Sequence, residues 1–166
     1  MPPYDWSRFS TRININADHQ DIYAAWSTRR GLERWFLRVA EFAKPDNTLR
    51  DDIDAIAKGD AYRWLWYGYD DSVAEKGTIL DANGKDFLRF TFAGSCVVTV
   101  VIKKEVDETI VELIQENIPL DETARTNYHL GCMTGWTFYL ANLKSILEGG
   151  IDLRNRNQNL QKVINA

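Results

Sequence analysis

The sequence has few cysteines and no cluster of basic residues. Two cysteines, Cys96 and Cys132, occur among 166 residues. Both lie in apolar stretches and form neither a disulfide framework nor a paired metal motif, so we expect buried, reduced thiols in a cytoplasmic protein. The 20 lysines and arginines are scattered among 24 acids, and the net charge is −4. Without a basic patch to meet phosphates, the composition argues against nucleic-acid binding.

Long apolar runs are also missing. No stretch approaches the roughly 18 apolar residues of a membrane-spanning helix, and the first residues, MPPYDWSRF, do not resemble a secretion signal. We therefore expect no membrane span. The length suits a single domain over residues 1–166, with a core at about 9–154 and a polar tail at 155–166.

The common catalytic motifs are absent as well. The chain contains no G-x-S-x-G, no G-x-G-x-x-G, no G-x-x-x-x-G-K and no H-E-x-x-H. These absences remove the usual hydrolase, dinucleotide, nucleotide and zinc functions. We expect no metal, no cofactor and no catalytic residue, and a function in binding rather than catalysis.

The first part of the chain predicts one strand and two short helices. Residues Phe9–Ala17 alternate between apolar and polar side chains, which is typical of a half-buried strand. Asp18 can cap a following helix that ends near Gly31. A second short helix is expected over Leu32–Phe36.

Further strands follow, separated by turn residues. They are predicted at Arg38–Lys44, Ala61–Tyr69, Gly77–Asp81, Phe87–Phe92, Cys96–Glu105 and Thr109–Ile118. Asn83-Gly84 is a strong hairpin signal between two of them. The segment Leu49–Lys58 fits either a loop or a helical turn. In the last strand Ile110, Ile114 and Ile118 share a face with two glutamates, so we expect that face to look toward solvent.

A long amphipathic helix is predicted from Asp121 to about Glu148, where Gly149-Gly150 stops it. At 1.5 Å per residue it spans roughly 40 Å, enough to cross a sheet. Hairpin-connected strands make an antiparallel sheet, and an amphipathic helix arriving last must cover its apolar face. The pattern therefore predicts an α+β domain.

Two segments resemble the START-like (SRPBCC) superfamily, and within it bacterial relatives of the heat-shock protein 90 ATPase activator. They are INADHQDIYAAWSTRRGLERWF, residues 15–36, and GWTFYLANLKSILEGGIDLR, residues 135–154. The resemblance implies the helix-grip fold, in which a curved antiparallel sheet of about six to seven strands wraps around a long C-terminal helix, with two short helices after the first strand. It also implies a cavity near the N-terminal half of that helix.

Strand alternation predicts which side chains face this cavity. On the aromatic strand, Tyr62, Trp64 and Trp66 share the face that lacks a charge, so we place them inward. The other predicted ligand-binding residues are Trp35, Phe36, Leu88, Phe90, Phe92, Gln115, Asn117, Tyr128, Cys132 and Trp136. This set is mainly apolar with a few polar groups, which is typical of a small-molecule site, although the same rings can instead fill a core.

These observations lead to three candidate functions. The first is non-catalytic binding of a hydrophobic or aromatic small molecule, lipid-like or polyketide-like. The second is a protein-interaction or co-chaperone-like module, or a homodimer, that uses an outward strip of Leu65, Tyr67 and Tyr69. The third is a cyclase- or dehydratase-type enzyme in which Tyr128, His129 or Gln115 positions the substrate.

Overall fold

A single seven-stranded sheet and a long C-terminal helix form the structure, a computed structural model that describes residues 2–160 and 162–164. The strands are β1 (Phe9–Asn14), β2 (Val39–Ala43), β3 (Ala61–Leu65), β4 (Glu75–Ala82), β5 (Phe87–Phe92), β6 (Cys96–Glu105) and β7 (Glu108–Glu116). The helices are α1 (His19–Ser27), α2 (Arg29–Trp35), α3 (Glu122–Ala124), the π-helical η1 (Arg125–Gly131) and α4 (Cys132–Leu147).

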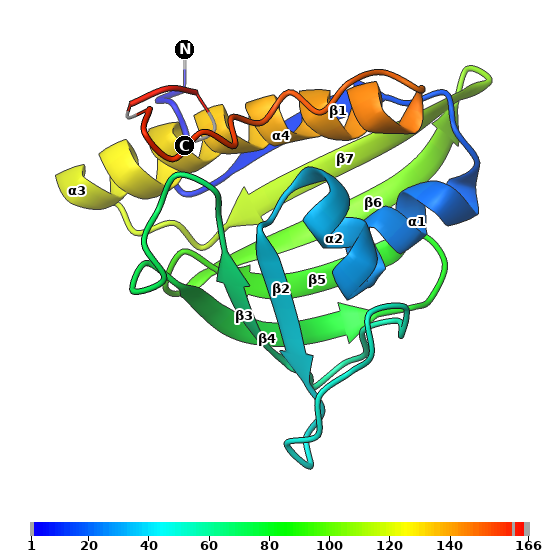
Figure 1. Ribbon diagram of the computed structural model, residues 1–166. Helices are drawn as coiled ribbons and strands as arrows, with labels where there is room; N and C mark the ends of the chain where they lie inside the picture. Colours follow the sequence, from blue (N-terminus) through cyan, green and yellow to red (C-terminus); the bar gives the residue numbers. More distant parts are fainter. Residues whose placement is uncertain (1, 161, 165–166) are drawn as a thin grey trace.

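The sheet is antiparallel throughout and curls around the long helix. Its strand order is β1-β7-β6-β5-β4-β3-β2. In β4 the register shifts between Ile79 and Asp81, a β-bulge of the kind that bends a strand. Figure 1 shows β2 and β3 running steeply across the direction of β5 and β6, with α4 lying along the sheet and α1 and α2 near one end of it. The predicted helix-grip fold is confirmed.

The core lies between the sheet and the helices. Alternate residues of β6 and β7 are buried, for example Val98, Val100 and Leu113, and Leu140 and Leu143 of α4 are buried too. Each such side chain stabilises the fold by roughly 1.5–3 kcal/mol relative to exposure. Among the described helices, none is both long enough and apolar enough to cross a membrane.

The corner between α1 and α2 differs from the prediction. Gly31 does not end the first helix, which stops at Ser27, but lies inside α2. A Cβ at Gly31 would come within 2.2 Å of the carbonyl oxygen of Ala24. Glycine therefore permits close packing of the two helices rather than a helix stop. The segment left open at Leu49–Lys58 forms a loop in which Ile56 is buried.

Two strands also end earlier than predicted. The aromatic strand ends at Leu65, not Tyr69, and Leu65 is buried although the alternation placed it outward. The last strand ends at Glu116, and Asn117 adopts a φ of 62°. This left-handed residue breaks the alternation, so Ile118 is buried and the expectation that it faces solvent is wrong.

Helical turns run without a break from Glu122 to Leu147, through α3, η1 and α4. These bounds are close to those predicted for the long helix. The Asp121 side chain accepts a hydrogen bond from the Ala124 N–H at 3.0 Å, which confirms it as the N-terminal cap. Gly149, with a φ of 82°, follows the last turn as expected of a helix stop. Of the predicted polar tail at 155–166, residues 161, 165 and 166 lie outside the described residues.

Candidate functional site

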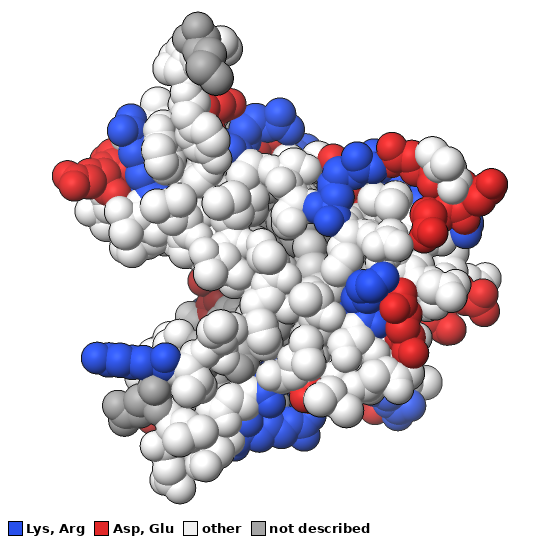
Figure 2. Space-filling model, turned by 90° about the horizontal axis from the view of Figure 1, so that it is seen from above, with Lys and Arg blue, Asp and Glu red and all other residues white. Residues whose placement is uncertain are grey.

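A pocket of about 720 Å³ lies between the N-terminal half of the long helix and one end of the sheet. Residues of η1 and α4 form one wall, and Trp66, Phe92 and the loop before β4 form the other. Figure 2 shows the molecule hollowed on the side where α3 lies in Figure 1, with walls of mostly uncharged residues. The cavity therefore occurs at the half of the helix that the superfamily resemblance implies.

Six of the sequence-predicted residues line this pocket: Phe36, Trp66, Phe92, Tyr128, Cys132 and Trp136. The rings of Phe36, Trp66, Phe92 and Trp136 contact one another around the opening. Phe36 lies 5.0 Å from Trp136 between ring centroids, and Phe92 lies 5.1 Å from Trp136. These three elements, the end of α2, the end of β5 and α4, converge because the bent sheet folds over the helix.

Five predicted residues are packed in the core and do not line the pocket: Trp35, Tyr62, Trp64, Leu88 and Phe90. Tyr62 and Trp64 stack on each other with centroids 3.9 Å apart. The Trp35 indole N–H donates to the Ala25 carbonyl at 2.8 Å. Alternation correctly turned these side chains inward, but it cannot separate the filled part of an interior from the open part.

Tyr128 lines the pocket, whereas the other two predicted polar groups, Gln115 and Asn117, lie elsewhere. The Gln115 side chain is fully buried and is already hydrogen-bonded to Trp136 and to the backbone of Tyr128. Asn117 is exposed beyond the end of β7, outside the pocket. It does not line the cavity because the strand stops at Glu116, two residues before its predicted end.

His129 faces away from the pocket. It is fully buried, its Nδ1 lies 3.0 Å from the Trp6 carbonyl oxygen and its Nε2 lies 2.9 Å from the Tyr4 hydroxyl. The rings of Tyr4, Trp6 and Phe9 surround it. His129 therefore anchors the N-terminal segment to η1, and the enzyme hypothesis loses the acid–base group that it had placed in the pocket.

The predicted outward strip does not exist as a surface. Leu65 is buried, and Tyr67 lies beneath the guanidinium groups of Arg154 and Arg156, 5.4 and 5.2 Å from its ring. Tyr69 is 49% exposed and lines the pocket. The chain turns at Gly68, which has a φ of 84°, so the tyrosines no longer follow the strand's alternation.

Sequence reasoning missed nine lining residues. From the sheet side they are Tyr69, Val73, Glu75, Ala93 and Gly94, and from the helix Asn127, Gly131, Gly135 and Tyr139. The helix glycines carried a usable signal, because residues four apart on a helix share a face and two glycines there leave a hollow. A Cβ at Gly135 would meet no atom within 4 Å.

Three groups in the pocket, Glu75, Cys132 and Tyr139, have raised pKa values, and burial is the largest cause for each. Burial raises the pKa of the Glu75 carboxyl, although a hydrogen bond from the Ala93 N–H opposes this effect. Burial also raises the pKa of the Cys132 thiol to about 11, so near neutral pH this thiol is protonated and a poor nucleophile. Within the described part of the chain, no group of three or more His, Cys, Asp or Glu residues could hold a metal ion.

The pocket wall contains a π-helical segment. The backbone of Arg125–Gly131 is wound with five-residue spacing, whereas the flanking turns are α-helical. Such segments are uncommon and occur frequently at functional sites. Here the wider turn places Asn127, Tyr128 and Gly131 on the pocket side and His129 on the other.

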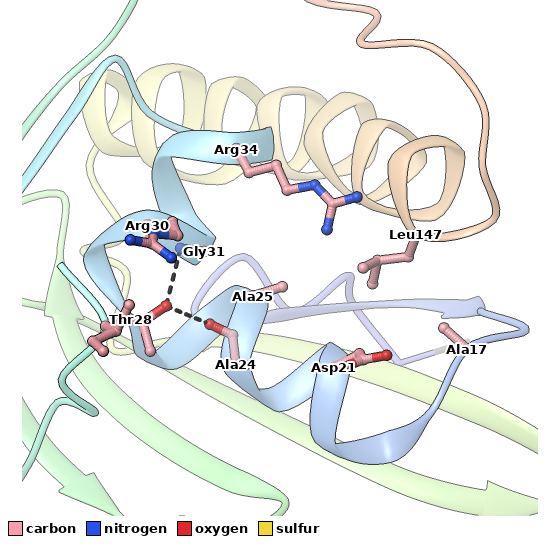
Figure 3. A pocket seen from close by; sticks show the side chains of 10 residues that line it. Ala17, Asp21, Ala24, Ala25, Thr28, Arg30, Gly31, Arg34 and Leu147 are labelled. Carbon is pink, nitrogen blue, oxygen red and sulfur yellow. Dashed lines mark hydrogen bonds between the residues drawn. The ribbon is translucent and has the colours of Figure 1, made fainter.

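A second, smaller pocket of about 470 Å³ lies between α1, α2 and the end of α4. Figure 3 shows the Thr28 hydroxyl donating to the Ala24 carbonyl and accepting from the Gly31 N–H, both at 2.9 Å. The Arg34 guanidinium extends toward the side of Leu147. Charged groups of both signs line this pocket, and it lacks the aromatic wall of the larger one.

The curled antiparallel sheet, the long closing helix and the pocket between them define a helix-grip domain of the START-like class. Residues 16–148 match the family model of Activator of Hsp90 ATPase homolog 1-like protein. The chain therefore belongs to this family.

Solved structures support the same fold. The Aha1 dimer from Colwellia psychrerythraea matches with a TM-score of 0.65 and 20% identity over 86% of this chain and 97% of that one. A Staphylococcus saprophyticus protein matches with a TM-score of 0.68 and 16% identity over 89% and 96%. DynU16, from the dynemicin biosynthetic locus, matches with a TM-score of 0.65 and 14% identity over 90% and 50%. Among curated proteins none matches the sequence.

Proposed function

We propose that this protein binds a hydrophobic or aromatic small molecule, lipid-like or polyketide-like, in the pocket between η1–α4 and the sheet, without catalysis. The observation that carries the proposal is the pocket itself, which is open to solvent and walled by the rings of Phe36, Trp66, Phe92 and Trp136. Its volume of about 720 Å³ lies within the range of small-molecule sites. The likeness to DynU16 is consistent with this class of ligand.

Two glycines support the proposal from the helix side. Gly131 and Gly135 lie one turn apart on the wall of the pocket, and side chains there would occupy the space offered to a ligand. Glycine inside a helix costs roughly 1 kcal/mol relative to alanine. A helix that carries two of them on one face gives up stability for an open surface.

The test compares two substitutions at Gly135. Gly135→Leu places a branched side chain in the pocket, whereas Gly135→Ala adds one methyl group and raises helix propensity. Native mass spectrometry of protein purified from cells, with a thermal-shift panel of lipids and aromatic compounds, identifies a ligand. We expect the ligand to raise the melting temperature of the Gly135→Ala variant but not that of the Gly135→Leu variant. The absence of any bound compound, or equal binding by both variants, would contradict the proposal.

The family match favours one alternative, an activator of a heat-shock protein 90 ATPase. Because Leu65 and Tyr67 are covered, such an activity would need a surface other than the predicted strip. An ATPase assay with the bacterial chaperone separates the two functions, since Gly135→Leu is expected to leave stimulation of the chaperone's ATPase unchanged.

Self-association is a further proposal, which light scattering tests. The free thiols of Cys96 and Cys132 are consistent with the proposed cytoplasmic location.

A further inference from the structure

Among the described residues that line the large pocket, Glu75 is the one charged side chain. It is the first residue of β4 and pairs with Trp64 of β3 in the sheet register. One carboxyl oxygen accepts a hydrogen bond from the Ala93 N–H at 2.8 Å. Ala93 has a φ of 52° and Gly94 a φ of 76°, so a left-handed turn between β5 and β6 presents this N–H.

Among the residues that the structure describes, the Glu75 carboxyl has no positive partner. It takes part in no ion pair within residues 2–160 and 162–164, and its second oxygen has no hydrogen-bond partner there. Tyr69, Tyr128 and Tyr139 line the same pocket. Three titratable groups interact electrostatically with Glu75: Tyr62 from β3, Cys96 from β6 and Cys132 from α4. Burial raises the pKa of each of these three, so all stay neutral near pH 7. A half-buried carboxylate without a counter-ion is costly unless a ligand supplies one.

The aromatic rings of the pocket wall also attract cations, as the Glu75 carboxylate does. The rings of Phe36, Trp66, Trp136 and Tyr139 line the same pocket as Glu75, and Phe36 lies 4.9 Å from Tyr139 and 5.7 Å from Trp66. Indole and phenyl faces carry negative potential and attract organic cations. A pocket with such faces and one acid favours a cation over an anion.

We propose that the pocket selects an organic cation, an amine or quaternary ammonium compound with an aromatic or aliphatic body, whose nitrogen lies against Glu75. This inference rests on the proposed function, because it names the ligand class of the same site. The body of the ligand packs on the rings, and the carboxylate and ring faces together neutralise the charge. Fatty acids and other carboxylates are disfavoured, since they bring a second negative charge to Glu75.

Three matched probes test the charge preference: 2-(1-naphthyl)ethylamine, 2-(1-naphthyl)ethanol and 1-naphthylacetate, titrated calorimetrically at pH 7.5. We expect the amine to bind at least about tenfold more tightly than the alcohol and the carboxylate to bind least. Glu75→Gln keeps an acceptor for the Ala93 N–H and should reduce amine affinity to that of the alcohol, with alcohol binding little changed. Glu41→Gln is the control, because Glu41 pairs with Arg63 on β3 and does not line the pocket.

The pH dependence gives a second readout. The trimethylammonium analogue of the amine keeps its charge at all pH values, so its affinity should fall as pH drops through the raised pKa of Glu75. Glu75→Gln should remove this dependence. Binding of the alcohol as tightly as the amine, or unchanged amine affinity in Glu75→Gln, would overturn the cation inference and leave the pocket function standing. Failure of all three probes to bind would overturn both.

Discussion

Trp136 of α4 donates its indole N–H to the side-chain oxygen of Gln115 on β7 at 3.0 Å, behind the wall of the large pocket. The amide group of Gln115 in turn donates to the Tyr128 carbonyl oxygen in η1 at 3.1 Å. One fully buried side chain of the sheet thus holds both the π-helical turn and the first turns of α4. The position of the pocket wall depends on this amide, although the amide itself does not face the ligand space.

Replacing Gln115 with leucine should therefore destabilise the protein. The change leaves the Trp136 indole N–H and the Tyr128 carbonyl without their partner in a buried place, which costs about 2–4 kcal/mol. Urea denaturation measures the free energy of unfolding. Asn117→Gly is the matched control on the same segment, because Asn117 is exposed with a φ of 62° and glycine accepts that conformation. It should change stability by less than about 0.5 kcal/mol, and an equal effect of both changes would contradict the role given to Gln115.

A second prediction concerns the loop before β3. Arg50 ion-pairs with Asp60, whose side chain is 0% exposed, and Asp60 also accepts from the Ala57 N–H at 2.9 Å. Arg50→Met removes the partner of a buried charge and should destabilise the protein by about 3–5 kcal/mol. Adding Asp60→Asn to this variant should restore part of the loss.

The exposed pair of Arg30 and Asp52 is the control for that experiment. Its side chains are 69% and 50% exposed, and such pairs contribute about 0–1 kcal/mol. Denaturant titration of Arg30→Met should show a change within this range. If Arg50→Met behaved like Arg30→Met, the buried pair would have no special role in holding the loop.

The sequence predicted the architecture well because hydrophobic periodicity sets it. The alternation in Phe9–Ala17 and the three- and four-residue spacing after Asp121 each require one buried face. The Asn83-Gly84 turn and the Asp121 cap are local chemistry, and both occur where expected. The fold follows from these local rules once the sheet must be covered by the last helix.

The pocket was predicted only in part, because non-local geometry decides which inward side chains meet empty space. Trp64 and Trp66 share a strand face in the sequence pattern, yet Trp64 is in the core and Trp66 lines the pocket. The strand ends between them, and alternation contains no information on strand ends. Glu75 was missed because an acid beside a turn is ordinarily solvated, and only the folded sheet places it among aromatic rings.

The third prediction concerns the loss of stability at low pH. Burial by itself would raise the pKa of Asp152, but hydrogen bonds from Arg154 and Arg156 outweigh it, so the pKa lies below its usual range. A carboxyl whose folded-state pKa is depressed stabilises the fold above its unfolded pKa of about 4, and this contribution is lost as pH falls below that value. Asp152→Asn should therefore lower the melting temperature at pH 7 and flatten its decline between about pH 4 and pH 2.

Asp21→Asn is the comparison for this measurement. Asp21 is exposed in the first turn of α1 and has no ion pair among residues 2–160 and 162–164. The melting temperature of the Asp21→Asn variant should fall with decreasing pH as it does in the parent protein. An Asp152→Asn variant with the same decline would mean that Asp152 does not support the bonds by which Arg154 links the C-terminal segment to the Glu33 and Arg34 carbonyls of α2.

The last prediction separates the two faces of η1. His129 and Tyr128 are neighbours, but Tyr128 lines the pocket and His129 holds the N-terminal segment through Tyr4 and Trp6. His129→Phe preserves a buried ring and removes both hydrogen bonds, at a cost of about 1–3 kcal/mol. Hydrogen exchange should therefore speed up in residues 4–8, while affinity for a pocket ligand stays within about twofold of the parent because the lining is intact. A large loss of ligand affinity without faster exchange in that segment would instead place His129 in the binding site and revive a catalytic role for it.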